Sequence, residues 1–334
     1  MSKIPCILLH IQPDQRPFYL PAEIEAAIGE LTEKLVVWEH PGPDAEAFRD
    51  RMVELQPTVV VGGWGTPRLP LPMPASVKYV CYLGGSLKGI VGRAHLEAGL
   101  PVTNWGNSIS RTVAEHAQFL VMAALRRARL WNVTMHDERG WGAERAETAS
   151  LFGQRVGVHG FGFIARAFVE LIAPYGCAVS SFAPWMDPAL FAEHGVRTVD
   201  SLDALFAEND VVVGLAPLMD QTRDSIGEAQ LRLLRPGGVF VNVGRGHVVD
   251  EAALARVAAE GRIHVGLDVY RDEPLPADSP LRGLSNVFLT PHMAGPTHDR
   301  RKDSAAFALA NLRAFAAGEP LQAVVTPEIY DIST

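Results

Sequence analysis

The chain has 334 residues, of which 48% are hydrophobic, and its formal net charge at pH 7 is −8. At roughly 100 to 200 residues per domain, this length predicts two domains, each able to bury its own core. The mildly acidic balance argues against a polyanionic partner such as nucleic acid. No uncharged stretch is long enough to span a bilayer and the apolar start is too short for a signal peptide, so we expect a cytoplasmic protein with no membrane partner.

The cysteines do not indicate a disulfide framework. Cys6, Cys81 and Cys177 are odd in number and far apart, and their spacing is not that of zinc ligands. The chain also has neither an H-E-x-x-H nor a C-x-x-C pair. We therefore expect buried thiols and no metal site.

The first hundred residues alternate short apolar runs with helical patterns. The runs CILLH, LVVWE, TVVVGG and KYVCYLGG predict strands, and helices are predicted at 21–34 and from Asp44 onward. This β-α-β-α order predicts a parallel sheet covered by helices on both faces.

A long amphipathic helix is predicted next, at about 110–131. Its apolar residues form one stripe: Val113, Ala117, Leu120, Val121 and Leu125. After it the alternation restarts, with strands predicted in RVGVHGF, AVSSFA, DVVVGLAP, GVFVNVG, HVGLDVY and NVFLTPH, and a last helix at about 297–317. The chain therefore consists of two α/β halves.

The stretch VGVHGFGFIARAF, residues 156–168, contains Gly160, Gly162 and Ala165 in a G-x-G-x-x-A arrangement. A predicted strand precedes the glycines and a predicted helix follows them, which is the context of a dinucleotide-binding turn. Gly160 makes the tight turn, Gly162 lets a pyrophosphate approach the backbone, and the helix start offers free N–H groups and a positive dipole end. The sequence therefore predicts a nucleotide cradle.

The acidic residue that normally binds the adenosine ribose is missing from this fingerprint. Its expected position carries Ala183, and the following residues Pro184 to Asp187 include no cation for a 2′-phosphate. Arg197, on the next predicted strand, reaches such a phosphate only if the loop folds back. We expect NAD as the cofactor, with Trp185 covering the adenosine, and leave NADP open.

Three later stretches contain candidate catalytic residues: NVGRGHVVDEAAL with Arg245, LDVYRDEPLP with Glu273 and LTPHMAG with His292. In order and spacing they resemble the signatures of the D-isomer-specific 2-hydroxyacid dehydrogenases, which include phosphoglycerate dehydrogenases and glyoxylate/hydroxypyruvate reductases. The segment RTVAEHAQFLVMAAL is similar to that family's interdomain helix. The resemblance implies two doubly wound parallel-sheet domains: a Rossmann NAD-binding domain, 105–295, inserted in a flavodoxin-like substrate domain, 1–104 plus 296–334.

The resemblance also implies roles for the three candidates. Arg245 would hold the substrate's carboxylate and carbonyl, His292 would exchange the proton with the hydroxyl oxygen, and Glu273 would pair with His292. The chemistry agrees, because hydride transfer to a ketone leaves an alkoxide that needs a proton donor, and His provides one near neutral pH. Arg is always charged and its planar fork fits a carboxylate.

Further site residues follow from the resemblance alone. Those implied at the cofactor are Gly160, Phe161, Gly162, Phe163, Ile164, Ala183, Ala216, Pro217, Thr222, Val243, Gly244, Arg245, Asp268, His292 and Gly295. Asp268 would bond the carboxamide; the alternative is a strand-end Asp that caps the next turn.

The substrate-binding residues implied are Gly84, Gly85 and Arg245. The chain departs from the family pattern at Gly84 to Lys88, where Gly-x-Gly-x-Asp is usual, and at Gly106-Asn107, where Pro-Gly is usual. Backbone N–H groups of Gly84 and Gly85 are still able to hold a carboxylate. The particular 2-oxo acid stays open.

Three functions fit these features to different degrees. The first is an NAD(P)-dependent oxidoreductase acting on a D-2-hydroxy acid and its 2-oxo acid. The second is a dinucleotide-sensing, corepressor-like binding protein with little turnover. The third, a hydrolase of the adenosylhomocysteine type, is disfavoured by the Arg-Glu-His order and the short length. The apolar face of the 110–131 helix and the segment RLWNVTMHDERGW after it predict a symmetric homodimer.

Overall fold

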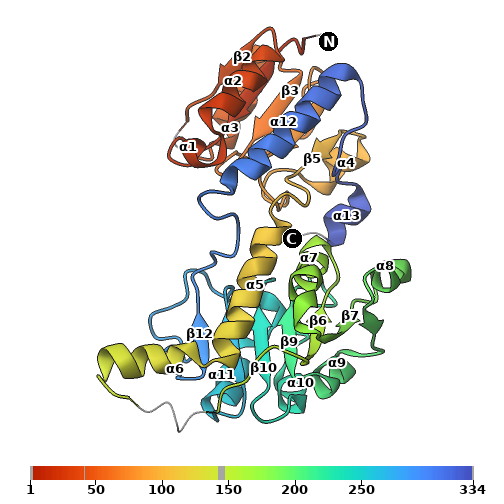
Figure 1. The fold of residues 1–334 in the computed structure, drawn as a ribbon. Helices are drawn as coiled ribbons and strands as arrows, with labels where there is room; N and C mark the ends of the chain where they lie inside the picture. The colour runs from red at the N-terminus through yellow and green to blue at the C-terminus, as the bar shows by residue number, and fades with distance from the viewer. Residues whose placement is uncertain (1–2, 41, 142–146, 333–334) are drawn as a thin grey trace. The chain divides into compact units, whose positions relative to one another are not determined.

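The computed structural model describes residues 3–40, 42–141 and 147–332. The chain divides into two compact units. Unit 1 contains the residues up to Ile109 and those from Pro296 onward, and unit 2 runs from Ser110 to Gly295. Each unit is built on one parallel sheet (Figure 1), which confirms the predicted fold class. In the described residues, no helix has the length and apolarity needed to cross a membrane.

Unit 1 contains a five-stranded sheet in the order β2-β1-β3-β4-β5, the order of flavodoxin-like folds. The strands are β1 Ile7–His10, β2 Leu35–Val37, β3 Val59–Gly62, β4 Tyr79–Tyr82 and β5 Val102–Thr103. All neighbours pair in parallel. Strand β5 was not among the predicted strands, because two residues are too few to show a pattern.

Helices cover both faces of this sheet. They are α1 Arg16–Tyr19, α2 Ala22–Glu30, α3 Ala45–Leu55, α4 Arg93–Glu97, α12 Arg301–Ala317 and α13 Pro327–Ile332. Because side chains alternate along a strand, Ile7 packs in the core with Leu312 of α12, while Leu8 packs on the other face with Phe48 of α3. This is why a central strand such as β3 is apolar at every position. Helix α12 begins four residues later than predicted.

Unit 2 contains a seven-stranded sheet in the order β12-β11-β10-β9-β6-β7-β8. Counted from β6, the order is 3-2-1-4-5-6 with a seventh strand at the edge, which is the Rossmann arrangement. The strands are β6 Arg155–His159, β7 Ala178–Phe182, β8 Arg197–Thr198, β9 Val211–Gly214, β10 Val239–Asn242, β11 His264–Leu267 and β12 Val287–Leu289.

The helices of unit 2 form two layers around its sheet. They are α5 Ser110–Leu125, α6 Ala128–Asn132, α7 Phe163–Ile172, α8 Pro188–Glu193, α9 Leu202–Glu208, α10 Glu228–Leu233 and α11 Glu251–Ala259, with a π-helical turn at Val133–Asp137 and 3₁₀ turns at Ala173–Tyr175 and Gly246–Val248. On one face Phe206, Leu231 and Leu254 pack with Phe240 of β10. On the other face α5 packs against α7, β10 and β11.

The predicted helix at 110–131 is interrupted. Arg127 lies in the left-handed region, with φ of 57°, and a right-handed helix cannot continue through such a residue. Helix α6 therefore leaves in another direction (Figure 1). The apolar stripe of α5, including Val113, Ala117 and Leu120, is buried within unit 2. It is not the dimer surface that the sequence suggested.

Candidate active site

Four loops of unit 2 bring the predicted site residues to one edge of its sheet. Gly160 follows β6, Arg245 follows β10, Asp268 follows β11, and His292 follows β12. Because all these strands are parallel, their carboxyl ends meet at the same edge, where ligands bind in doubly wound folds. The three predicted catalytic residues all belong to unit 2.

His292 and Glu273 form a direct pair. The His292 Nδ1 lies 2.5 Å from the Glu273 Oε2, and the other carboxylate oxygen accepts the N–H of Tyr270 at 3.0 Å. A carboxylate only accepts, so Nδ1 carries the proton and Nε2 is the nitrogen that remains for a ligand. His292 has a positive φ of 51°, an uncommon conformation for a residue other than Gly and one that clusters at functional sites.

The carboxylate of Asp268 holds the loop that contains His292. Asp268 is fully buried, and it accepts the backbone N–H groups of Met293 and Ala294, both at 2.8 Å. The Thr290 hydroxyl also donates a hydrogen bond to Asp268 at 2.7 Å. The same hydroxyl accepts a hydrogen bond from His116 Nε2 at 3.0 Å. One side chain therefore holds the backbone after His292 and the hydroxyl of Thr290 before it.

These hydrogen bonds determine the charge state of Asp268. Burial by itself raises the pKa of a carboxyl group. The nearby His116, whose Nε2 lies 3.5 Å from Oδ1, and the hydrogen bonds from the loop outweigh it and hold the pKa of Asp268 below its ordinary value. Asp268 is thus a buried carboxylate at neutral pH. Its stabilising contribution is present above the ordinary Asp pKa of about 3.9 and is lost as the pH falls through the lower folded-state value.

Arg245 is positioned by the buried side chain of Asn242. The Asn242 amide donates to the Arg245 carbonyl at 3.1 Å and accepts the N–H of Gly244 at 3.0 Å. The Arg245 guanidinium donates to the Gly244 carbonyl at 2.7 Å. Burial lowers the pKa of Arg245 and the charge of Glu273 opposes this, so the group stays a cation. It makes no ion pair in the described chain and has donors left for a carboxylate ligand.

The glycine turn has the shape that a pyrophosphate needs. Gly160 has φ of 93°, and a Cβ there would lie 2.7 Å from the Cα of Ala216, so only Gly fits. A Cβ on Gly162 would meet no protein atom within 4 Å. Gly162 is the N-cap of α7 and no side chain caps that end, so its N–H groups are open to an anion. These residues fit a dinucleotide.

The remaining predicted cofactor residues lie around this turn or in the loops after β9, β10 and β12. Thr222 ties the loop after β9 together, donating to the Pro217 carbonyl at 2.6 Å and accepting the Met219 N–H at 2.8 Å. The Phe161 side chain is buried and stacks on Phe191, so only its backbone is available. The others occupy loop or helix-start positions: Phe163, Ile164, Ala183, Ala216, Val243, Gly244 and Gly295.

Two cations near the cradle differ in their availability. Arg166 lies over the ring of Phe163 at 4.7 Å and has no acidic partner among the described residues. Arg197 instead pairs with Glu208 at 2.6 Å. Arg197, which the sequence suggested for a 2′-phosphate, is therefore already paired with Glu208. Arg166 was not among the predicted site residues.

Gly84 and Gly85 lie in unit 1, after β4. Their N–H groups have no hydrogen-bond partner in the part of the chain that the structure describes. A Cβ on Gly85 would lie 2.6 Å from the Trp105 ring, and that ring contacts Trp64 with centroids 5.5 Å apart. Sequence reasoning missed these aromatic neighbours, because the two tryptophans come from separate segments with no shared pattern.

Replacing Asp268 by Asn tests its structural role. We expect Asp268→Asn to lower the free energy of unfolding by about 1.5–3 kcal/mol at pH 7, because the new NH₂ group meets a backbone N–H instead of accepting it. The difference from the native protein should shrink as the pH falls below about 4, where the carboxyl group of the unfolded chain protonates, and should vanish below the lower folded-state pKa of Asp268. Urea unfolding measures both.

The matched control is Asp250→Asn. Asp250 is the N-cap of α11 and accepts the Ala253 N–H, a role that Asn fills equally well, so stability should hardly change. Equal stability of the two variants would contradict the role assigned to Asp268.

Comparison with known proteins agrees with this geometry. Residues 118–294 match the family model described as D-isomer specific 2-hydroxyacid dehydrogenase, NAD binding domain. The chain is 31% identical over 295 residues to D-3-phosphoglycerate dehydrogenase of Mycobacterium tuberculosis, covering 88% of this chain and 55% of that protein. It is 34% identical over 244 residues to glyoxylate reductase of Korarchaeum cryptofilum, covering 70% and 71%. The chain spans about half the length of the phosphoglycerate dehydrogenases it matches.

Solved structures give the same result. A glyoxylate reductase from Paecilomyes thermophila superposes with a TM-score of 0.78 at 27% identity, covering 97% of this chain and 99% of that one. The holo form of Rhodotorula graminis D-mandelate dehydrogenase has the same fold, with a TM-score of 0.81 at 20% identity and coverage of 97% and 98%. The chain belongs to the D-isomer specific 2-hydroxyacid dehydrogenase family, and its second unit is an NAD-binding domain of that family.

Proposed function

We propose that this protein is an NAD-dependent oxidoreductase that interconverts a D-2-hydroxy acid and its 2-oxo acid. The observation that carries the proposal is the Glu273–His292 pair beside the unpaired Arg245 guanidinium. The curated relatives that the chain matches are named as dehydrogenases and reductases. The enzyme is therefore favoured over the corepressor-like alternative.

The two units divide the work in this proposal. We propose that unit 2, Ser110–Gly295, is the dinucleotide-binding domain, predicted as 105–295, and that unit 1 is the substrate domain, predicted as 1–104 plus 296–334. When bound, the nicotinamide ring supplies or accepts the hydride. Gly160, Gly162 and the start of α7 hold the pyrophosphate. Asp268 Oδ2 accepts a single backbone N–H, so it keeps a lone pair for the carboxamide.

The triad residues act on the substrate. The planar guanidinium of Arg245 binds the carboxylate of the substrate, and the oxo group of the substrate then faces His292. During reduction Nε2 gives its proton to the oxygen that becomes the hydroxyl group, and during oxidation it takes that proton back. Glu273 stabilises the imidazolium and holds the ring through Nδ1. His292 and Glu273 thus form one proton-exchanging unit.

The substrate contacts of unit 1 are also proposals. The free N–H groups of Gly84 and Gly85 are suited to a carboxylate, and Trp64 and Trp105 favour an oxo acid with an apolar or aromatic substituent. A turnover screen of glyoxylate, hydroxypyruvate, pyruvate and phenylpyruvate with NADH and with NADPH tests the function. The absence of turnover with these and with other 2-oxo acids would contradict the proposed function.

We also propose a cytoplasmic homodimer. Exposed apolar side chains in unit 2 include Phe119, Met122, Met135 and Trp141, which are candidates for burial against a second copy. The three free cysteines suit a reducing compartment, and cell fractionation tests that location. The absence of nucleic-acid and membrane partners stays a prediction.

The mass of the protein in solution tests the dimer. We expect twice the chain mass at micromolar concentration by sedimentation equilibrium, because the exposed apolar groups gain from burial. A monomeric mass under these conditions would refute the dimer.

Two glycine variants separate folding from cofactor binding. Gly160→Ala should lose both stability and NADH affinity, because its Cβ collides with backbone at Ala216. Gly162→Ala should keep the native stability and lose NADH affinity by tenfold or more, because its Cβ occupies space left for the pyrophosphate. Thermal unfolding and NADH titration measure the two effects. Native NADH affinity in Gly162→Ala would argue against the cradle.

The triad predicts large kinetic losses. Arg245→Lys and His292→Gln should each lower turnover by at least about a hundredfold, because a planar anion clamp or a general acid is removed. Arg271→Lys is the control, since the side chain of Arg271 forms only an exposed pair with Asp224 and its backbone bond to Glu251 is kept in the variant. Steady-state rates near the native value in both triad variants would end the assignment.

A further inference from the structure

His159 is a buried histidine that the proposed chemistry does not use. It is the last residue of β6, directly before Gly160, and is 1% exposed. Its Nδ1 is buried without a hydrogen-bond partner, and neither ring nitrogen makes a hydrogen bond within the described chain. Burial lowers the pKa of His159 to about 4, so the ring is neutral at physiological pH and has one donor and one acceptor.

The neighbours of His159 place it at the adenosine end of the cradle. In the parallel pairing of β6 and β7 it lies beside Phe182, and the two rings stack with centroids 6.2 Å apart. The Trp185 ring meets it in an edge-to-face arrangement, with ring centroids 6.0 Å apart. Phe182 and Trp185 flank Ala183, the position where the usual ribose-binding carboxylate is missing.

A polar ring is energetically unfavourable at this buried position. Buried polar groups in native proteins nearly always have partners, and an unsatisfied one costs stability. An apolar residue at this position would avoid that cost, and Val156 and Val158 are buried apolar residues of the same strand. A hydrogen-bonding group of the bound adenosine would satisfy the His159 ring. His159 would in turn supply the acceptor that the adenosine lacks at Ala183.

We propose that His159 hydrogen-bonds the adenosine half of the dinucleotide and replaces the carboxylate missing at Ala183. The proposal rests on the proposed NAD-dependent function. Trp185 is only half-buried and is the neighbouring ring that moves to admit the ligand. His159 is then a determinant of cofactor affinity and not a catalytic residue.

The test is calorimetric binding of ADP-ribose and of nicotinamide mononucleotide. His159→Phe keeps the ring contacts and removes both hydrogen-bonding groups. It should weaken ADP-ribose binding about tenfold, equivalent to 1.4 kcal/mol, and leave mononucleotide binding unchanged. Thermal stability of the ligand-free variant should equal or exceed the native value. His159→Asn, which returns a donor and an acceptor near Nδ1, should recover part of the affinity.

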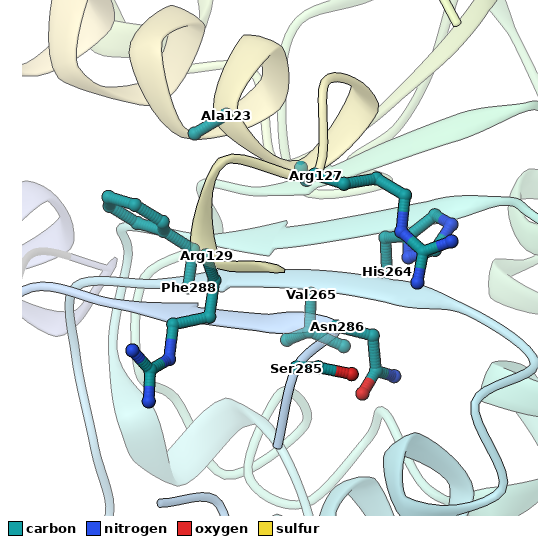
Figure 2. A pocket seen from close by; sticks show the side chains of 9 residues that line it. Ala123, Arg127, Arg129, His264, Val265, Ser285, Asn286 and Phe288 are labelled. Atoms are coloured by element: carbon teal, nitrogen blue, oxygen red, sulfur yellow. The ribbon is translucent and has the colours of Figure 1, made fainter. Parts of the chain in front are cut away.

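His264 provides a matched control. It begins β11, at the opposite end of the sheet, and its Nδ1 is also buried without a partner. Figure 2 shows it beside Arg127 in a hollow that also includes Ser285 and Asn286. His264→Phe should leave ADP-ribose affinity unchanged.

Three outcomes would overturn the proposal. One is native ADP-ribose affinity in His159→Phe, and another is a ligand-free His159→Phe that is less stable than the native protein, since its ring nitrogens would then be satisfied without ligand. An equal affinity loss in His264→Phe would show a general effect of the substitution. Failure of the native protein to bind ADP-ribose would instead refute the dinucleotide function itself.

Discussion

The hydrogen bonds of one buried carboxylate, Asp268, hold the loop that contains the proposed proton donor. Asp268 lies at the end of β11 and fixes the backbone of Met293 and Ala294, while Thr290 completes the connection on the other side of His292. His292 has a positive φ, which is an unfavourable conformation for a residue with a side chain, and these hydrogen bonds hold it there. The alternative considered from sequence, in which Asp268 caps the next turn, therefore describes part of its role, and that turn contains the proposed proton donor.

A single side chain also positions Arg245. Asn242 holds Gly244 and Arg245 with one amide, just as Asp268 holds the His292 loop with one carboxylate. Both supporting residues are buried at the ends of adjacent strands, β10 and β11, whose register is fixed by the sheet. The reactive side chains are thus attached to the rigid part of unit 2, which is what preorganised catalysis requires.

The sequence predicts the central strands well because they are buried on both faces, so runs such as Val211–Gly214 are apolar throughout. The glycine turn and the Arg-Glu-His order were also readable, since they are local or depend on order along the chain. The break at Arg127 was not readable, because arginine favours helices and its left-handed conformation depends on packing. His116, Asn242 and the aromatic neighbours of Gly85 escaped notice because their roles arise only from contacts between distant segments.

The path of the chain through the two units has a consequence for how the protein is made. Unit 2 is continuous in sequence, whereas the core of unit 1 combines Ile7 and Leu9 with Leu309 and Leu312 of α12. During synthesis the first sheet emerges before the helix that covers one of its faces. Unit 2 is able to fold as soon as residue 295 leaves the ribosome, while unit 1 must wait with an exposed apolar face until α12 is translated. The order of folding is therefore the reverse of the order in which the two units begin.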